Sequence, residues 1–448
     1  MTTAVSLKLA APRWHAGLTR GHWRVLAASF LGWIFDGYES YALVVVLPFA
    51  LRSLLSPKEL QTTAIWAGMA IGVTLLGWGI GGLVGGTLAD YLGRKRVMIL
   101  SVLAYALLSG VTALSVSFTM FAVLRFITGF AMGSEWSTGV AMLAETWPDR
   151  ARPKGAGLLQ SGFGWGTLLA ALVWWAIGRL QPLGGESWRL VFVIGALPAL
   201  ATVYIRRALN ESERWRQAVR EQRWAATERD ARTERTTVAR PLTITEIFRQ
   251  PESRRRVLLL LVMSFASMVG WWAISTWLPA YAQDLAHAEH YTNLAAWSSR
   301  AATLYTIGTV VSYMSSGFLA DAIGRKGFLL VTYAGALLLT PVTYLWTHSV
   351  EALLFVAPIN GFFTLGLAFS WMAIYLPELF TSSVRSTASS FVFNSTRLVA
   401  WVFPILAGSM IQEFGGVSRA AVTMGMVYVL GLLVPWFLPD TTGKPLPD

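Results

Sequence analysis

The sequence predicts an all-α membrane protein whose twelve transmembrane helices form two pseudo-symmetric halves of six. Its 448 residues are 54% hydrophobic and 13% charged, with a mean hydropathy of +0.52, so polar surface is too scarce to cover a soluble globule. One ten-residue motif occurs twice, as GTLADYLGRK at 86–95 and as GFLADAIGRK at 317–326. A basic turn that recurs between long apolar stretches is typical of a chain built from two related halves.

Apolar stretches of about 20 residues, the length that spans a bilayer, place the helices. The first half, residues 1–206, is expected to hold six, near 23–50, 64–89, 97–116, 119–144, 155–179 and 188–206. The second half, residues 257–448, is expected to hold six more, near 257–282, 295–320, 328–347, 352–376, 387–411 and 420–438.

The stretch between the halves, residues 207–256, is rich in Arg and Glu and poor in glycine. We expect a cytoplasmic polar linker with amphipathic helical stretches on the membrane surface, for example at 214–233. A regulatory domain in this stretch is the alternative.

Glycines are frequent in the second predicted helix. They are Gly68, Gly72, Gly77, Gly81, Gly82, Gly85 and Gly86. Small residues spaced four apart allow helix backbones to approach closely. This face is therefore expected either to pack tightly or to let neighbouring helices slide.

Lys and Arg give the expected orientation. With the N-terminus inside, 28 of the 36 lie in segments on that side, so the positive-inside rule places both termini in the cytoplasm. The first apolar run is too long for a cleavable signal and contains Asp36, so it is expected to stay as the first helix. This asymmetry accounts for the net charge of +12 without a nucleic-acid partner.

Each copy of the ten-residue motif is expected to form a short cytoplasmic loop, in which a glycine permits a tight turn before a basic pair. A second repeat aligns ETWPDRARPKGAG at 145–157 with ELFTSSVRSTASS at 378–390. We expect these residues to act as switches that bridge the halves in one state and separate in another; solvated loop charges are the alternative. The candidates are Asp90, Gly93, Arg94, Glu145, Arg152, Asp321, Gly324, Arg325, Glu378 and Arg385.

Six charged residues fall inside the predicted helices, where a charge is costly unless it faces a partner or a water-filled cavity. They are Asp36, Glu39, Arg125, Glu135, Arg300 and Arg397. Asp36 lies about twelve residues into the first helix, near mid-depth, and Glu39 follows on roughly the same face. Arg300 lies close enough to the outer surface for its side chain to reach it.

Histidine is absent from these helices, so a proton crossing the membrane with a solute would be carried by a carboxylate. Asp36 is the first candidate by depth, followed by Glu135 and then Glu39. The alternative for Asp36 and Glu135 is a permanent ion pair with an arginine.

Arginine presents a planar fork that binds a carboxylate through two parallel hydrogen bonds. Arg397, with Asn394 three residues before it, is therefore the best candidate pair for an anionic ligand, and Arg125 is the second. Aromatic residues of neighbouring helices are expected to line a cavity or simply to pack. They are Trp271, Trp272, Trp277, Trp371 and Tyr375.

The sequence speaks against an enzyme. It has no cysteine, so disulfides and thiolate-bound metals are excluded. We find no nucleophile–base constellation, no cluster of metal ligands and no phosphate-binding loop. No metal or cofactor is therefore expected, and an ATP-driven pump would need a separate ATPase.

The repeated loop resembles the signature loop of the major facilitator superfamily, which joins the second helix to the third and the eighth to the ninth. Residues 22–48, 124–148 and 187–199 are similar to the sialate:proton and aromatic acid:proton symporters of that superfamily. The shared features are an Asp-Gly-aromatic-acidic group at 36–39, Arg125, and a Gly-x-Glu-aromatic group at 133–136. NESERW at 210–215 also resembles the segment after the sixth helix of sugar-porter-like members.

The resemblance implies the major facilitator fold and uptake of a small organic anion with protons. Monocarboxylates, aromatic acids and acidic sugars all fit this class. The implied location is a bacterial inner (plasma) membrane, and the implied state is a monomer in the lipid bilayer.

Three other functions remain open: uptake of a sugar, polyol or zwitterion, export by proton antiport, and a membrane-embedded enzyme or scaffold. Exporters of this superfamily typically carry Gly-Pro-x-x-Gly-Gly in the fifth helix. That helix reads QSGFGWGTLLAALV here and lacks the proline.

Overall fold

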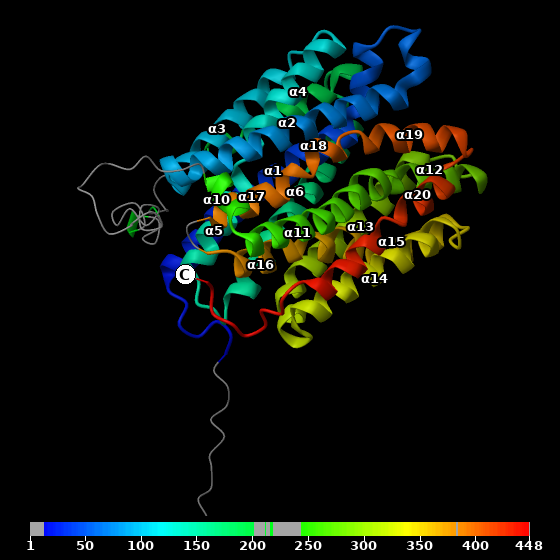
Figure 1. The fold of residues 1–448 in the computed structure, drawn as a ribbon. Helices are drawn as coiled ribbons and strands as arrows, with labels where there is room; N and C mark the ends of the chain where they lie inside the picture. The colour runs from blue at the N-terminus through cyan, green and yellow to red at the C-terminus, as the bar shows by residue number, and fades with distance from the viewer. Residues whose placement is uncertain (1–12, 201–210, 212–215, 218–242, 382–383, 448) are drawn as a thin grey trace, which may run out of the picture.

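The helices of the chain run side by side along one axis and form a single bundle (Figure 1). The computed structural model describes residues 13–200, 211, 216–217, 243–381 and 384–447, and within these ranges it contains helices and no strand. Figure 1 shows the blue and cyan helices on one side of the bundle and the yellow and red helices on the other. The two halves of the sequence therefore form two lobes.

The first half follows most of the predicted ranges, but its last described helix ends at Ile194, and residues 201–206 of the predicted sixth helix lie outside the described residues. Its helices are α1 (Arg20–Leu54), α2 (Thr63–Leu92), α3 (Arg94–Thr112), α4 (Phe118–Met132), α5 (Glu135–Thr146), α6 (Arg152–Leu180) and α7 (Trp188–Ile194), with single turns η1 (Glu59–Thr62) and η2 (Gly184–Glu186). One predicted helix, 119–144, is interrupted between α4 and α5 at Gly133. A Cβ atom there would lie 2.1 Å from the backbone nitrogen of Gly82, so only glycine fits this close approach.

The second half has more interruptions. It begins with α10 (Thr243–Arg249), α11 (Pro251–Val269), η4 (Gly270–Ile274), η5 (Ser275–Trp277), α12 (Leu278–Ala288), α13 (Leu294–Ala322) and α14 (Gly324–Tyr344). It continues with α15 (Val350–Gly361), η6 (Phe362–Leu367), α16 (Ala368–Leu379), α17 (Arg385–Ser395), α18 (Arg397–Ala400), α19 (Phe403–Glu413), α20 (Val417–Gly425), α21 (Tyr428–Leu433) and η7 (Val434–Phe437). Both η4 and η6 are π-helical, a form common at functional sites.

The first helix of the second half begins earlier than the sequence suggested. Pro251 occupies its first turn, where a missing backbone N–H costs nothing. The short helix α10 precedes it, inside the predicted linker, and packs against α11. The predicted amphipathic stretch 214–233 lies almost wholly outside the described residues.

Both copies of the repeated loop form the expected tight turn. Gly93 and Gly324 have φ values of 96° and 74°, a region that side chains other than glycine rarely adopt. The turn lets α3 begin directly after α2, and α14 directly after α13.

In each half, a side chain from a later segment accepts hydrogen bonds from the backbone of this turn. The Glu211 carboxylate accepts hydrogen bonds from the backbone nitrogens of Arg94 (2.9 Å) and Lys95 (3.2 Å). The Thr442 hydroxyl accepts from the backbone nitrogen of Arg325 (3.0 Å) and donates to Asp440 (2.5 Å). Hydrogen bonds from Thr442 hold the pKa of Asp440 below its ordinary value, so this cap keeps its charge.

Helix α2 packs tightly on both lobes through its glycines. A Cβ at Gly81 would lie 1.9 Å from the Phe130 carbonyl oxygen of α4. On the opposite side, a Cβ at Gly82 would lie 2.1 Å from the Asn394 side chain of α17. The glycine face thus provides close packing, and it brings α2 against the second lobe as well as the first.

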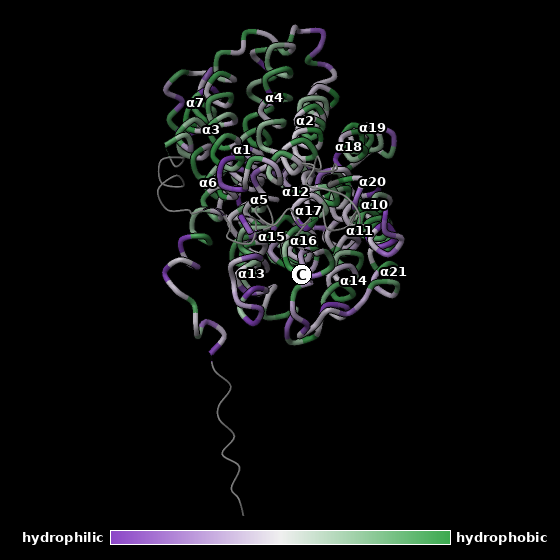
Figure 2. The backbone as a smooth tube through the Cα atoms, turned by 60° about the vertical axis from the view of Figure 1, so that its left-hand side comes forward, coloured by the Kyte–Doolittle hydropathy of each residue, from purple (hydrophilic) through white to green (hydrophobic). Residues whose placement is uncertain are grey.

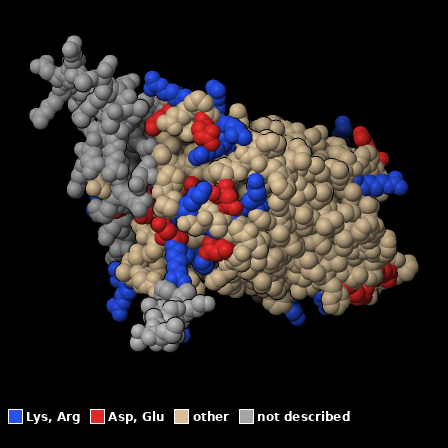
Figure 3. Space-filling model, turned by 60° about the horizontal axis from the view of Figure 1, so that its bottom comes forward, with Lys and Arg blue, Asp and Glu red and all other residues tan. Residues whose placement is uncertain are grey.

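An apolar belt surrounds the bundle. Figure 2 shows hydrophobic residues along the helices and hydrophilic ones mostly near the helix ends and connections. In Figure 3, charged side chains gather mainly at one end of the molecule, a few lie at the other end, and the middle is nearly free of them. Within the described ranges, nine helical segments are long and apolar enough to cross a membrane. Exposed large apolar side chains such as Phe355 and Leu338 then face lipid.

Candidate functional site

Three buried charges meet where the two lobes touch. Asp36 of α1, Glu135 at the start of α5 and Arg397 at the start of α18 are each at most 2% exposed. Asp36 interacts electrostatically with both of the others. Gly32 lies one turn before Asp36, and a Cβ there would lie 2.0 Å from the Glu135 carboxylate, so glycine makes room for it.

The two carboxylates of this cluster lack hydrogen-bond donors. Neither oxygen of Asp36 and neither oxygen of Glu135 has a hydrogen-bond partner among the described residues. An ionised carboxylate in such a place has lost its hydration without replacement. The protonation state of these two carboxylates should therefore depend strongly on any ion or ligand that enters the cluster.

Arg397 is held by residues of the preceding helix, α17, and by aromatic rings. Its Nη1 donates to the Phe393 carbonyl (2.6 Å) and to Asn394 Oδ1 (3.2 Å). The guanidinium carbon lies 4.4 Å from the Trp78 ring centroid and 4.1 Å from that of Phe393. The predicted pair of Arg397 and Asn394 is thus in contact, with the amide orienting the guanidinium.

Aromatic rings from both lobes surround the charges. The rings of Trp136 and Phe393 stack with centroids 3.7 Å apart. Phe163 contacts Trp33 at 5.0 Å and Trp271 at 5.4 Å. The surroundings of the charged cluster therefore consist largely of aromatic rings, and we call this set of rings the aromatic shell.

The sequence analysis identified only part of this shell. Trp271 belongs to it, whereas the Trp371 indole donates to Ser267 and the Tyr375 hydroxyl donates to the Pro439 carbonyl, both within the second lobe. Trp272 contacts Trp271 with its ring tilted by 58°, and Trp277 is half-buried in the second lobe. Phe393 was missed, although its place one helical turn before Arg397 was a usable signal.

Glu39 and Arg125 form a separate ion pair inside the first lobe. Arg125 Nη1 lies 2.5 Å from Glu39 Oε1, and Arg125 Nη2 donates to the hydroxyls of Thr112 and Thr128. The Ser109 hydroxyl donates to the other Glu39 oxygen. The sequence grouped Glu39 with Asp36 as candidate proton carriers, and Arg125 with Arg397 as candidate anion-binding residues. In the structure Glu39 and Arg125 instead engage each other.

Arg300 lies apart from both clusters, near the start of α13. Its side chain is exposed and lies 4.9 Å from the Trp297 ring centroid. It lines a shallow surface pocket of about 460 Å³ with Trp175 and Leu172 of α6. This agrees with the expected surface-reaching side chain.

The repeated charges pair in the same way in each half. Arg94 lies 3.4 Å from Glu145, and Arg325 lies 2.7 Å from Glu378 and 2.6 Å from Asp321. The side chain of Asp90 lies outside the described set. The pairs join α3 to α5 in the first lobe, and α14 to both α13 and α16 in the second.

The remaining two residues of the second repeat have different partners. Arg152 pairs with Asp149. Arg385 donates from Nε to the Pro377 carbonyl (3.1 Å) and from Nη2 to the Pro447 carbonyl (2.7 Å). Arg385 therefore ties α17 to the C-terminal segment.

An ion pair that the sequence analysis missed joins the two lobes. Lys154 at the start of α6 pairs with Asp321 at the end of α13. Beside it the backbones nearly touch, because a Cβ at Gly317 would lie 2.3 Å from the Pro153 carbonyl oxygen. The lobes are closed together at this end of the bundle.

We predict that Lys154→Met loosens this closed end. The loss of a charge-assisted hydrogen bond costs about 1–2 kcal/mol, which corresponds to roughly tenfold more of the open state. The chain has no native cysteine, so Ser316→Cys, buried against Gly157 of the other lobe, would report opening through its rate of alkylation by a polar maleimide. Lys95→Met, at the same end, is the control. Equal labelling rates in both backgrounds would contradict a latch at Lys154.

We predict that Glu39→Gln destabilises the first lobe by about 3–5 kcal/mol, because it leaves the buried Arg125 charge unpaired. The double variant Glu39→Gln/Arg125→Gln should lose less than the sum of the single variants. Unfolding in detergent measures both effects. Glu186→Gln, which breaks a half-exposed pair with Arg189, is the control and should cost at most about 1 kcal/mol. Additive losses would show that the two groups are not coupled.

Comparison with known proteins agrees with this architecture. The chain matches the family "sugar (and other) transporter" over residues 25–448. The cis,cis-muconate transport protein of Acinetobacter baylyi is 26% identical, covering 91% of this chain and 92% of that protein. The sialic acid transporter NanX of Escherichia coli is 25% identical, covering 97% and 98%.

The fold has a close counterpart among solved structures. The proton:xylose symporter XylE, a major facilitator superfamily protein, matches with a TM-score of 0.74 at 18% identity, covering 95% of this chain and 97% of that one. The chain therefore belongs to the sugar (and other) transporter family, has the major facilitator fold, and is a multi-pass membrane transporter of small metabolites rather than an enzyme.

Proposed function

We propose that this transporter takes up a small organic anion together with protons. The observation that carries the proposal is the cluster at the contact of the lobes, where two buried carboxylates without hydrogen-bond partners, Asp36 and Glu135, lie near each other and Asp36 also interacts electrostatically with the buried guanidinium of Arg397. Relatives named for cis,cis-muconate, sialic acid and niacin support an acidic substrate. The likeness to a proton:xylose symporter supports proton coupling.

The proposed cycle begins with a proton on Asp36 or Glu135. Neutralising either carboxylate removes the cost of its buried charge and leaves the positive charge of Arg397 without its full counter-charge. A substrate carboxylate then binds the guanidinium. With charge compensated, the lobes rock and open the site to the cytoplasm, where anion and proton leave.

The surroundings of Arg397 favour a flat acid. Its guanidinium already lies against Trp78 and Phe393, and further rings from both lobes complete the shell. Such walls stack well on a conjugated or aromatic ring. Within the class of small organic anions we therefore favour planar unsaturated and aromatic carboxylates over acidic sugars.

The charged loops are proposed as the gate. The two intralobe pairs, Arg94 with Glu145 and Arg325 with Glu378, hold each lobe's loop in shape, and Lys154 with Asp321 holds the lobes together. Asp90, Arg152 and Arg385 are assigned to the same gate by their place in the repeats, and Gly93 and Gly324 by their turns. The basic loops support a gate and both termini on the cytoplasmic side, with the chain in a bacterial inner membrane.

Proteoliposomes that contain the purified chain and an internal pH dye test the proposal. Monocarboxylic, aromatic and sugar acids, and neutral sugars, would be added outside, with protein-free liposomes as the control. Internal acidification above that control for one class of acid supports symport. Transport of neutral sugars without a proton signal would instead establish a sugar facilitator.

We predict that Asp36→Asn abolishes proton-driven accumulation of the anion but retains part of the exchange between preloaded and external substrate. The amide cannot release a proton, whereas exchange needs no net proton movement. Uptake of radiolabelled substrate with and without a pH gradient measures the two activities. Asp284→Asn, a carboxylate on α12 outside the cluster, is the matched control. Accumulation that survives in Asp36→Asn would move the proton site to Glu135.

We predict that Arg397→Lys raises the apparent KM for the anion at least tenfold. Lysine keeps the charge but loses both the second parallel hydrogen bond and the flat face that lies on Trp78. Initial uptake rates across substrate concentrations measure the change, and Arg300→Lys, on the surface, is the control. An unchanged KM would place the anion site elsewhere.

A further inference from the structure

We propose that a groove between the start of α11 and the end of the chain's last helix binds the headgroup of an anionic phospholipid. The groove has a volume of about 320 Å³. Its walls are formed by Glu252, Arg255, Arg256 and Leu259 of α11, by residues 436–437 of η7, and by residues 438–439 of the segment after η7. It lies at the end of the bundle where the charged loops gather, and it is independent of the central cluster.

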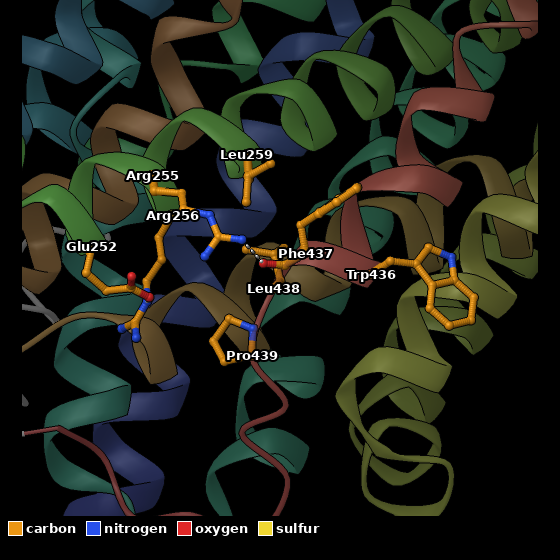
Figure 4. A pocket seen from close by; sticks show the side chains of 8 residues that line it. All are labelled: Glu252, Arg255, Arg256, Leu259, Trp436, Phe437, Leu438 and Pro439. Atoms are coloured by element: carbon orange, nitrogen blue, oxygen red, sulfur yellow. Dashed lines mark hydrogen bonds and ion pairs between the residues drawn. The ribbon is translucent and has the colours of Figure 1, made fainter.

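Arg255 supplies an available cation in this groove. Figure 4 shows its side chain reaching across toward the Phe437 carbonyl, to which Nη2 donates over a long 3.4 Å. Within the described residues it has no carboxylate partner. Arg256 differs, because its Nε donates to Glu252 at 3.1 Å and its Nη1 to the Leu379 carbonyl at 3.0 Å. Arg256 is therefore part of the wall, and Arg255 is left to face a ligand.

A second cation lies against the Trp436 ring. The ammonium nitrogen of Lys326 is 5.3 Å from the Trp436 ring centroid, and among the described side chains no carboxylate pairs with it. Among the residues that line the groove, two Arg stand against one Glu, so the lining has a net positive charge. The charge calls for an anion, and the fork of Arg255 suits a phosphate.

Apolar side chains continue the groove toward the lipid. Trp436 is 63% exposed and Phe437 is 60% exposed, and Leu258 on the neighbouring turn of α11 is 53% exposed. Aromatic rings at the end of a membrane-spanning segment sit at headgroup level. A free phosphate would gain nothing from these surfaces, whereas a phospholipid would place its glycerol and upper acyl chains on them.

The expected membrane leaflet of this groove also agrees with an anionic lipid as the ligand. The orientation proposed above puts this end of the bundle in the cytoplasmic leaflet, where anionic lipids concentrate and where basic pockets between transmembrane helices bind their headgroups. A lipid in this position would touch the first and last membrane segments of the second lobe together. It would thus fasten α11 to η7.

Native mass spectrometry of the full-length chain in detergent tests this, with phosphatidylglycerol and phosphatidylcholine as probes. Phosphatidylglycerol should bind at least tenfold more tightly than phosphatidylcholine. The double variant Arg255→Ala/Lys326→Ala should lose that preference, with an unchanged thermal midpoint in lipid-free detergent. Arg254→Ala is the matched control, because it removes the same charge from the same helix turn but does not line the groove.

Four results would overturn the proposal. These are equal binding of the two lipids, full phosphatidylglycerol binding by the double variant, an equal loss in Arg254→Ala, and displacement of phosphatidylglycerol by millimolar inorganic phosphate. The last would identify a soluble anion as the ligand. If the double variant unfolds, Arg255→Gln alone, which keeps the long polar side chain, should still lower the preference for phosphatidylglycerol severalfold. None of these readouts measures transport, so their outcome is independent of the proposed function.

Discussion

An ionised side chain in an apolar interior must be paired or neutralised, and this constraint arranges the centre of the transporter. Glu39 and Arg125 meet it by pairing with each other, with hydroxyl groups satisfying part of their remaining hydrogen-bonding capacity. Asp36 and Glu135 do not, because the described protein offers them no donor. The first pair joins α1 to α4 within the first lobe. We propose that the second cluster is the one that responds to protons and ligand.

The charges of the cluster are divided between the two lobes, which couples their interaction to the relative position of the lobes. Asp36 and Glu135 belong to the first lobe and Arg397 to the second, so any movement of one lobe against the other changes their electrostatic interaction. Lys154 and Asp321 place a similar pair across the lobes at one end of the bundle. Protonation and closure can therefore influence each other without any long chain of intermediates.

Close backbone contact makes the arrangement possible. Glycines let α2 pack against α4 on one side and against α17 on the other, which brings Arg397 within reach of a carboxylate on α1. The repeated loops are built alike in both halves, yet Glu211 caps one and Thr442 with Asp440 caps the other. The halves therefore share backbone geometry while their charges differ, as a pseudo-symmetric carrier with one asymmetric site requires.

The sequence by itself determined the membrane class, the two halves, the helix ranges and the tight turns at Gly93 and Gly324, because hydropathy, repetition and glycine are local signals. It also singled out six charges inside the predicted helices, since a charge is costly in lipid. Only the tertiary structure decided which charges meet. Asp36 and Glu39 are three residues apart, yet one faces Arg397 and the other Arg125. Pairing across helices depends on how the helices pack, and no spacing along the chain encodes it.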